Sequence, residues 1–63
     1  MNNIFESFSE LDELSEQLTD DDPGMRQVAV LDLGECSDPA AIPLLDRALQ
    51  DNESKVREQA ALM

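Results

Sequence analysis

The chain repeats itself with a period of 31 residues, and this repetition limits the folds open to it more than any other feature. A repeat of this length is one supersecondary unit that cannot bury its apolar face alone and must stack on a neighbouring unit. The 63 residues hold about two units. We place a divergent capping unit at 7–37 and a second unit at 38–63, which we expect to be incomplete at its C-terminal end and part of a longer repeat protein. The identical pairs at this offset are Leu18 and Leu49, Asp20 and Asp51, Arg26 and Arg57, Ala29 and Ala60, and Leu31 and Leu62.

Apolar residues within each unit recur at steps of three and four, as in Leu11, Leu14 and Leu18. This spacing places them on one face of a helix rather than on a strand. We therefore predict an all-α fold with four helices, over residues 7–18, 23–34, 39–50 and 54–63. The connectors of about four residues indicate two helical hairpins, each made of antiparallel neighbours.

Signals for the starts of helices fall where these apolar patterns begin. Ser7 is followed three residues later by Glu10, as in a capping box. Asp22 and Asp38 each stand directly before a proline, and an aspartate cap followed by proline at the first helical position is a typical helix start. The predicted caps are Ser7, Asp22, Asp38 and, for the last helix, either Asn52 or Ser54.

Two residues inside the predicted helices need an explanation. Gly34 closes the second helix, where a glycine in the left-handed conformation commonly satisfies the trailing carbonyl groups. Pro43 lies at the fifth position of the third helix and lacks the N–H group that an internal hydrogen bond requires. Either this helix begins with a loose turn, or it bends at Pro43.

The composition excludes several classes of protein. Four Lys and Arg residues against 15 Asp and Glu residues give a net charge of −11, and no Lys or Arg occurs before Arg26, so the basic stripe of a nucleic-acid-binding protein is missing. The single cysteine, Cys36, has no disulfide partner within the chain. Uninterrupted apolar runs are too short to span a membrane. We expect a reduced, cytoplasmic protein that binds neither nucleic acid nor membrane.

The unit as a whole resembles the HEAT-like repeat of the phycobilisome-lyase (PBS lyase) type. The similarity is strong from residue 18 to residue 63 and weak over 7–18. It implies an α-solenoid, an α-α superhelix in which helical hairpins stack, and the family carries a proline at the position of Pro43. The matching positions are Asp20, Met25, Arg26, Ala29, Val30, Leu33, Gly34, Asp38, Pro39, Ala41, Ile42, Pro43, Leu44, Leu45, Ala48, Leu49, Asp51, Val56, Arg57, Ala60 and Ala61.

The resemblance also implies a role for the most distinctive polar residues. In proteins similar to this one, Asp and Arg at these positions pair between neighbouring repeats and form a polar ladder inside the stack. A partly buried ladder of this kind would orient one repeat on the next, and we favour this structural role over ligand binding by the arginines. The ladder residues are Asp20, Arg26, Asp51 and Arg57.

The last predicted helix ends in four apolar residues with no glycine, basic residue or polar cap. A terminal repeat normally has a polar outer face, because a solenoid otherwise exposes the apolar layer meant for its next unit. We therefore predict a surface that receives a further repeat or forms a homodimer through the C-terminal helix. The residues assigned to this surface are Val56, Ala60, Leu62 and Met63.

The sequence contains little from which a catalytic or metal centre could be built. It has no His and no Tyr, and Cys36 has acidic sequence neighbours that disfavour a reactive thiolate. The acidic run that begins at Asp20 fails as a calcium loop, because Met25 stands where that loop needs glycine and Leu31 where it needs glutamate. We expect a protein that is not an enzyme and has no catalytic residue, cofactor or metal.

Three functions remain open. The strongly acidic surface favours a protein-binding or scaffold module with a basic partner, whose binding weakens as salt increases. The family resemblance allows a phycobilin lyase-type subunit that acts on a chromophore-bearing protein. The unfinished end allows a structural cap or self-association unit without a separate ligand.

Overall fold

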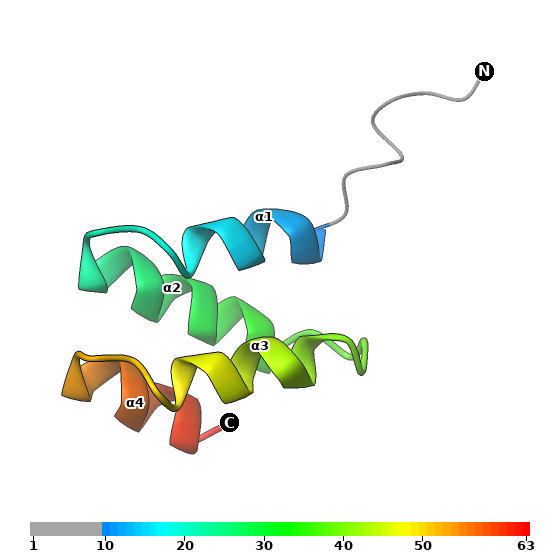
Figure 1. Cartoon of the computed structure of the whole chain (residues 1–63). Helices are drawn as coiled ribbons and strands as arrows, with labels where there is room; N and C mark the ends of the chain where they lie inside the picture. The colour runs from blue at the N-terminus through cyan, green and yellow to red at the C-terminus, as the bar shows by residue number, and fades with distance from the viewer. Residues whose placement is uncertain (1–9) are drawn as a thin grey trace.

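A computed structural model describes residues 10–63, and within this range every regular element is an α-helix, which confirms the predicted all-α class. Helices α1 (Glu10–Gln17), α2 (Pro23–Gly34), α3 (Ala41–Ala48) and α4 (Ser54–Ala61) follow one another along the chain (Figure 1). The predicted cap at Ser7 lies outside the described residues.

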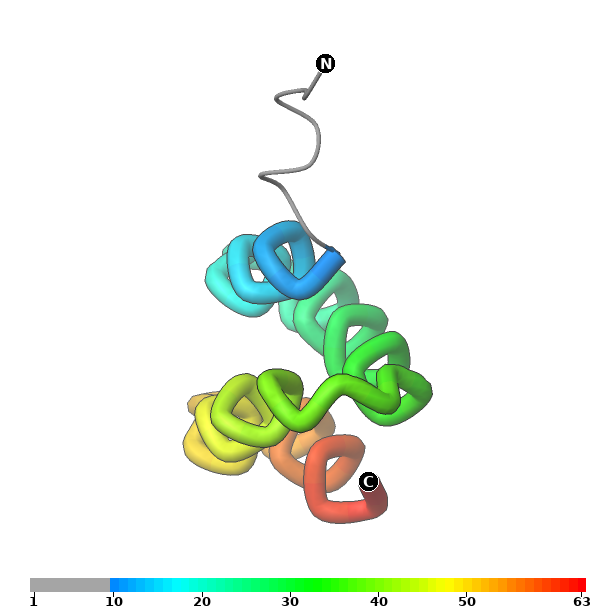
Figure 2. The backbone as a smooth tube through the Cα atoms, turned by 90° about the vertical axis from the view of Figure 1, so that its right-hand side faces the viewer, coloured from blue at the N-terminus to red at the C-terminus, as the bar shows by residue number. Residues whose placement is uncertain are grey.

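The helices form two antiparallel hairpins stacked one on the other (Figure 1). Seen roughly along the helix axes, α1 and α3 lie in one layer and α2 and α4 in the other (Figure 2). Helix α2 is the central element, since it contacts α1, α3 and α4. A hydrogen bond of 3.3 Å from Nη1 of Arg47 to Oγ of Ser15 also joins α3 to α1.

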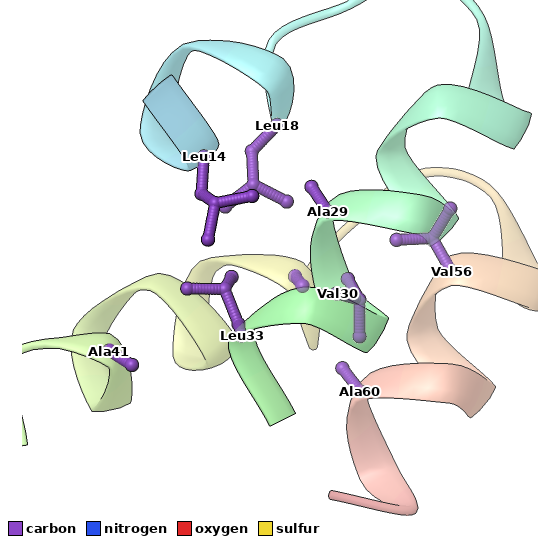
Figure 3. Close-up of a cluster of buried hydrophobic side chains, with 9 residues drawn as sticks. Leu14, Leu18, Ala29, Val30, Leu33, Ala41, Val56 and Ala60 are labelled. Atoms are coloured by element: carbon purple, nitrogen blue, oxygen red, sulfur yellow. The ribbon is translucent and has the colours of Figure 1, made fainter. Parts of the chain in front are cut away.

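The hydrophobic core is small and centres on α2. Ala29, Val30 and Leu33 of this helix are almost completely buried, at 0%, 0% and 1% exposed. Leu14 of α1 and Leu18 just after it point towards them from one side, and α4 covers them from the other (Figure 3). The core residues are Leu14, Leu18, Ala29, Val30, Leu33, Ala41, Ala48, Val56 and Ala60.

Of the helix caps predicted within the described residues, only Asp22 is confirmed. Oδ1 of Asp22 accepts a hydrogen bond of 2.9 Å from the backbone N–H of Gly24, as predicted. The predicted cap at Asp38 is wrong, because α3 has Ala40 as its N-cap and no side-chain cap hydrogen bond. Oδ1 of Asp38 instead accepts the N–H of Ala40 at 2.9 Å in the turn before the helix. For α4, both predicted candidates are wrong, because the N-cap is Glu53 and no side chain makes a cap hydrogen bond. Oδ1 of Asp51 accepts the N–H of Glu53 at 2.9 Å in the turn before the helix.

The start of α3 explains why Pro43 is tolerated. The helix begins at Ala41 rather than Pro39, after a turn in which Ala41 donates to the carbonyl of Asp38 and Ile42 to that of Pro39. The Pro39 carbonyl would be the helical acceptor for residue 43, and it is already occupied by Ile42 at 3.0 Å. The missing N–H of Pro43 therefore falls in the first turn of the helix, where it costs little. Of the two explanations, the loose turn is correct.

The predicted left-handed conformation of Gly34 is wrong, since no glycine among the described residues has a positive φ. Helix α2 ends instead in a right-handed residue, Glu35, with φ of −93°. The position of Gly34 has another physical reason. A Cβ atom placed there would overlap Sδ of Met63 and lie 3.1 Å from its Cγ, so the glycine gives room for the Met63 side chain.

A left-handed and a right-handed backbone at Gly34 predict opposite effects for Gly34→Ala when Met63 is free to move aside. Because the backbone is already helical and the Met63 side chain can move aside, we expect this variant to gain up to about 1 kcal/mol of unfolding free energy from the higher helix propensity of alanine. Urea unfolding, monitored by circular dichroism, measures this change in unfolding free energy. A loss of about 1 kcal/mol or more would contradict this expectation and indicate either a left-handed glycine or a Met63 side chain that is held in place.

Candidate functional site

The two hairpins are joined by a paired hydrogen bond between Arg26 of α2 and Asp51 in the turn before α4. Nε of Arg26 donates to Oδ2 of Asp51 at 2.8 Å, and Nη2 donates to Oδ1 at 3.0 Å. The two side chains are only 12% and 11% exposed. A two-point contact between a guanidinium and a carboxylate fixes orientation as well as distance. We call this contact the inter-repeat junction.

Arg26 also binds the turn that precedes its own helix. Nη1 donates to the carbonyl oxygen of Asp20 at 2.6 Å and to that of Asp21 at 3.3 Å. Nη2 additionally donates to Oδ1 of Asn52 at 3.3 Å. One guanidinium thus connects the turn between α1 and α2 to the turn between α3 and α4. This places the two hairpins in a defined register.

The second unit repeats half of this arrangement. Nη1 of Arg57 donates to the carbonyl oxygen of Asp51 at 2.6 Å, as Arg26 does to Asp20. Oδ1 of Asp20 accepts the N–H of Asp22 at 2.8 Å, as Oδ1 of Asp51 accepts that of Glu53 at 2.9 Å. Of the four predicted ladder residues, the structure pairs the side chains of Arg26 and Asp51 and leaves Asp20 and Arg57 at the two ends.

The junction changes the ionisation of both partners. The hydrogen bond to Asp51 raises the pKa of the Arg26 guanidinium, so this group stays charged. Burial acts to raise the pKa of the Asp51 carboxyl, but the hydrogen bonds from Arg26 and from the Glu53 amide outweigh it, and the pKa is lowered below its usual value. Both effects favour the ion pair over neutral side chains.

The predicted surface at the C-terminal helix is only partly present. Val56 and Ala60 are 0% and 6% exposed and lie between α4 and α2 (Figure 3), so their assignment to an open surface is wrong. They belong to the face of α4 that packs on the preceding unit. Leu62 and Met63 are 77% and 46% exposed and remain available at this end.

Sequence reasoning missed part of the junction. Asn52 accepts a hydrogen bond from Arg26, whereas the sequence predicts this residue only as a helix cap. A signal existed, because Asn52 is equivalent to Asp21 in the repeat and both contact Arg26. The carbonyl acceptors of Asp20 and Asp51 had no signal, since a backbone oxygen is present at every residue.

The other candidates considered from the sequence do not gather into a second site. Cys36 is half-buried and packs against the core, and its low reactivity stays a prediction. Within residues 10–63, no group of three or more His, Cys, Asp and Glu side chains is placed to hold a metal ion. The described helices include none that is long and apolar enough to cross a bilayer.

Comparison with known protein families gives the class of this fold. Residues 11–63 match HEAT repeats, and because the match covers most of the chain, the protein belongs to the HEAT repeat family. Searches of curated proteins and of solved structures found no match. The family match concerns HEAT repeats in general, so the more specific PBS lyase type stays a prediction.

The lowered pKa of Asp51 predicts a pH-dependent stability. A carboxyl whose pKa is lower in the folded state stabilises the fold fully above its unfolded pKa, near the ordinary value of 3.8, and loses this effect as the pH falls through the folded pKa. We expect Asp51→Asn to be less stable than the natural chain at pH 7, and we expect this difference to shrink with falling pH.

Urea unfolding over a pH series measures the difference in unfolding free energy between Asp51→Asn and the natural chain. The contributions of the other carboxylates cancel in this difference. Asp46→Asn is the matched control, since it makes the same charge change at an exposed position of α3. A difference between Asp51→Asn and the natural chain that is constant across the series would contradict the ionised junction.

Proposed function

We propose that the chain is a protein-binding or scaffold module and that its acidic surface selects a basic partner. Membership of the HEAT repeat family supports the first part, because stacked helical hairpins offer an extended surface to other proteins. The net charge of −11 supports the second part, since a strongly negative surface attracts and orients a positive one. In this proposal the module acts in the cytoplasm and has no catalytic role.

The distribution of charge is the observation that carries this proposal. Every Asp and Glu among residues 10–63 is exposed, except Asp51 and Glu53, which are partly buried. Two of the four basic residues, Arg26 and Arg57, donate hydrogen bonds from their guanidinium groups to backbone carbonyls in the turns before α2 and α4. The acidic side chains are therefore accessible, while part of the compensating positive charge is used inside the fold.

Helix α1 is the most acidic part of the described chain. It carries four acidic residues and no basic residue within eight positions. Its apolar side contacts α2 through Leu14, and the exposed carboxylates flank that side. Since α1 is the outer helix of the described stack, a basic segment can approach it without displacing any of the described helices (Figure 1). We propose α1 as the main contact for the partner.

Binding of a labelled peptide of mixed Lys and Arg sequence tests the proposal. We expect its affinity to fall steeply as salt increases, because charges separated by more than about 8 Å at physiological ionic strength are screened. The double substitution Glu13→Gln and Glu16→Gln on α1 should weaken binding more than Asp32→Asn and Glu35→Gln, which remove the same charge elsewhere.

Fluorescence anisotropy at several salt concentrations measures both effects, with circular dichroism to verify that each variant is folded. An affinity that does not change with salt contradicts the electrostatic basis of the proposal. Equal losses for the two double variants contradict the assignment to α1.

A further inference from the structure

The internal repeat shows which surfaces a stacked unit covers. Arg26 has a side chain that is 12% exposed at the junction, whereas its equivalent, Arg57, is exposed. Leu18 is 8% exposed, and its equivalent Leu49 is 43% exposed. The difference arises because the second unit covers the first, and no described residue covers the second. We call the exposed set Leu49, Arg57 and Ala61 the donor end, where Ala61 is the equivalent of the buried Val30.

The opposite end of the stack carries the complementary groups. Asp51 is 11% exposed and Val56 is 0% exposed, because both contact the preceding unit. Their equivalents in the first unit, Asp20 and Met25, are exposed, Met25 at 41%. We call Asp20 and Met25 the acceptor end. The donor and acceptor ends lie at opposite ends of the stacked hairpins, next to α3 and α4 and next to α1 and α2 respectively (Figure 1).

Both ends are already shaped like the two halves of the inter-repeat junction. At the donor end, the hydrogen bond from Nη1 of Arg57 to the Asp51 carbonyl holds the guanidinium as the matching bond holds Arg26. Within residues 10–63, no carboxylate is placed against Nε and Nη2 of Arg57, the two atoms that Arg26 uses to bind Asp51. At the acceptor end, the Asp22 amide holds Oδ1 of Asp20 as the Glu53 amide holds Oδ1 of Asp51.

From this correspondence we propose that two copies of the chain associate head to tail, with Arg57 of one copy paired with Asp20 of the next in the geometry of the Arg26–Asp51 contact. The occupant of the donor end is then a second copy of this chain. The contact is heterologous, so each copy keeps one free donor end and one free acceptor end, and assembly continues beyond the dimer unless the stack closes on itself.

The acceptor end differs from the internal junction in a way that limits the affinity. Glu10 and Gln17 stand at the positions of the buried Ala41 and Ala48, so the first unit offers a more polar surface to a neighbour. Two chains of net charge −11 also repel each other at long range. Added salt screens this repulsion more than it weakens a buried pair. We therefore expect association to strengthen from low to moderate salt, the reverse of binding to a basic partner.

Sedimentation velocity over a concentration series tests the proposal. We expect the mean mass of the natural chain to rise with concentration and to pass that of the dimer. Arg57→Glu and Asp20→Lys should each abolish this rise, because each places like charges in the contact. An equimolar mixture of the two variants should restore it, since the mixture contains the original Arg57 and Asp20 pair and its charge-reversed counterpart.

The controls separate this contact from its alternatives. Lys55→Glu makes the same charge change as Arg57→Glu on the same helix and should leave association unchanged. Asp20→Asn, which keeps an oxygen for the Asp22 amide, tests the acceptor if Asp20→Lys disturbs folding, and it should weaken association several-fold. A symmetric dimer through the C-terminal helices would stop at two copies and be insensitive to both Asp20 variants. That result, a mixture without restored association, or a monomer at all concentrations up to about 1 mM would each overturn the proposal.

Discussion

The packing of α2 on α4, oriented by the Arg26–Asp51 pair, is the contact on which the rest of the structure depends. A partly buried ion pair adds little net stability, because removing two charges from water offsets most of their attraction. Its value here is geometric. One guanidinium binds the turn of its own hairpin through Nη1 and the turn of the next hairpin through Nε and Nη2. The offset between hairpins is therefore defined by the size of a single rigid group.

The apolar contribution to the same interface comes from small side chains. Ala29 on α2 and Ala60 on α4 are at most 6% exposed. Val30 and Val56 belong to the same buried cluster. Small residues allow the helix axes to approach closely, so nine buried residues within 10–63 can hold the four described helices together. Such a core has few large side chains to lock one arrangement. The inter-repeat junction fixes the relative orientation of the two hairpins, which the alanines alone do not.

The same use of arginine shapes the surface of the molecule. Of four basic residues, two are bound to the turns before α2 and α4, and almost all acidic residues within the described range 10–63 are exposed. The fold thus converts an acidic composition into an accessible negative surface with a few positive groups held in fixed positions. The arginine contacts that hold the turns and the stacked hairpins thus leave the carboxylates free for the electrostatic recognition proposed for the module.

Local patterns in the sequence determined the helices and the cap at Asp22, and the family resemblance implied the pairing of Arg26 with an aspartate of the next repeat. These features depend on neighbours three or four positions apart or on a repeat that places equivalent residues alike. The tertiary structure alone decided that the Asp51 carboxylate binds both Arg26 and the Glu53 amide, that Gly34 gives room to Met63, and that Val56 and Ala60 are buried. Periodicity identifies the residues that share one face of a helix, but it does not contain the position of the helix that covers that face. For α4 this neighbour is the preceding α2, because stacking places the face of each unit on the unit before it.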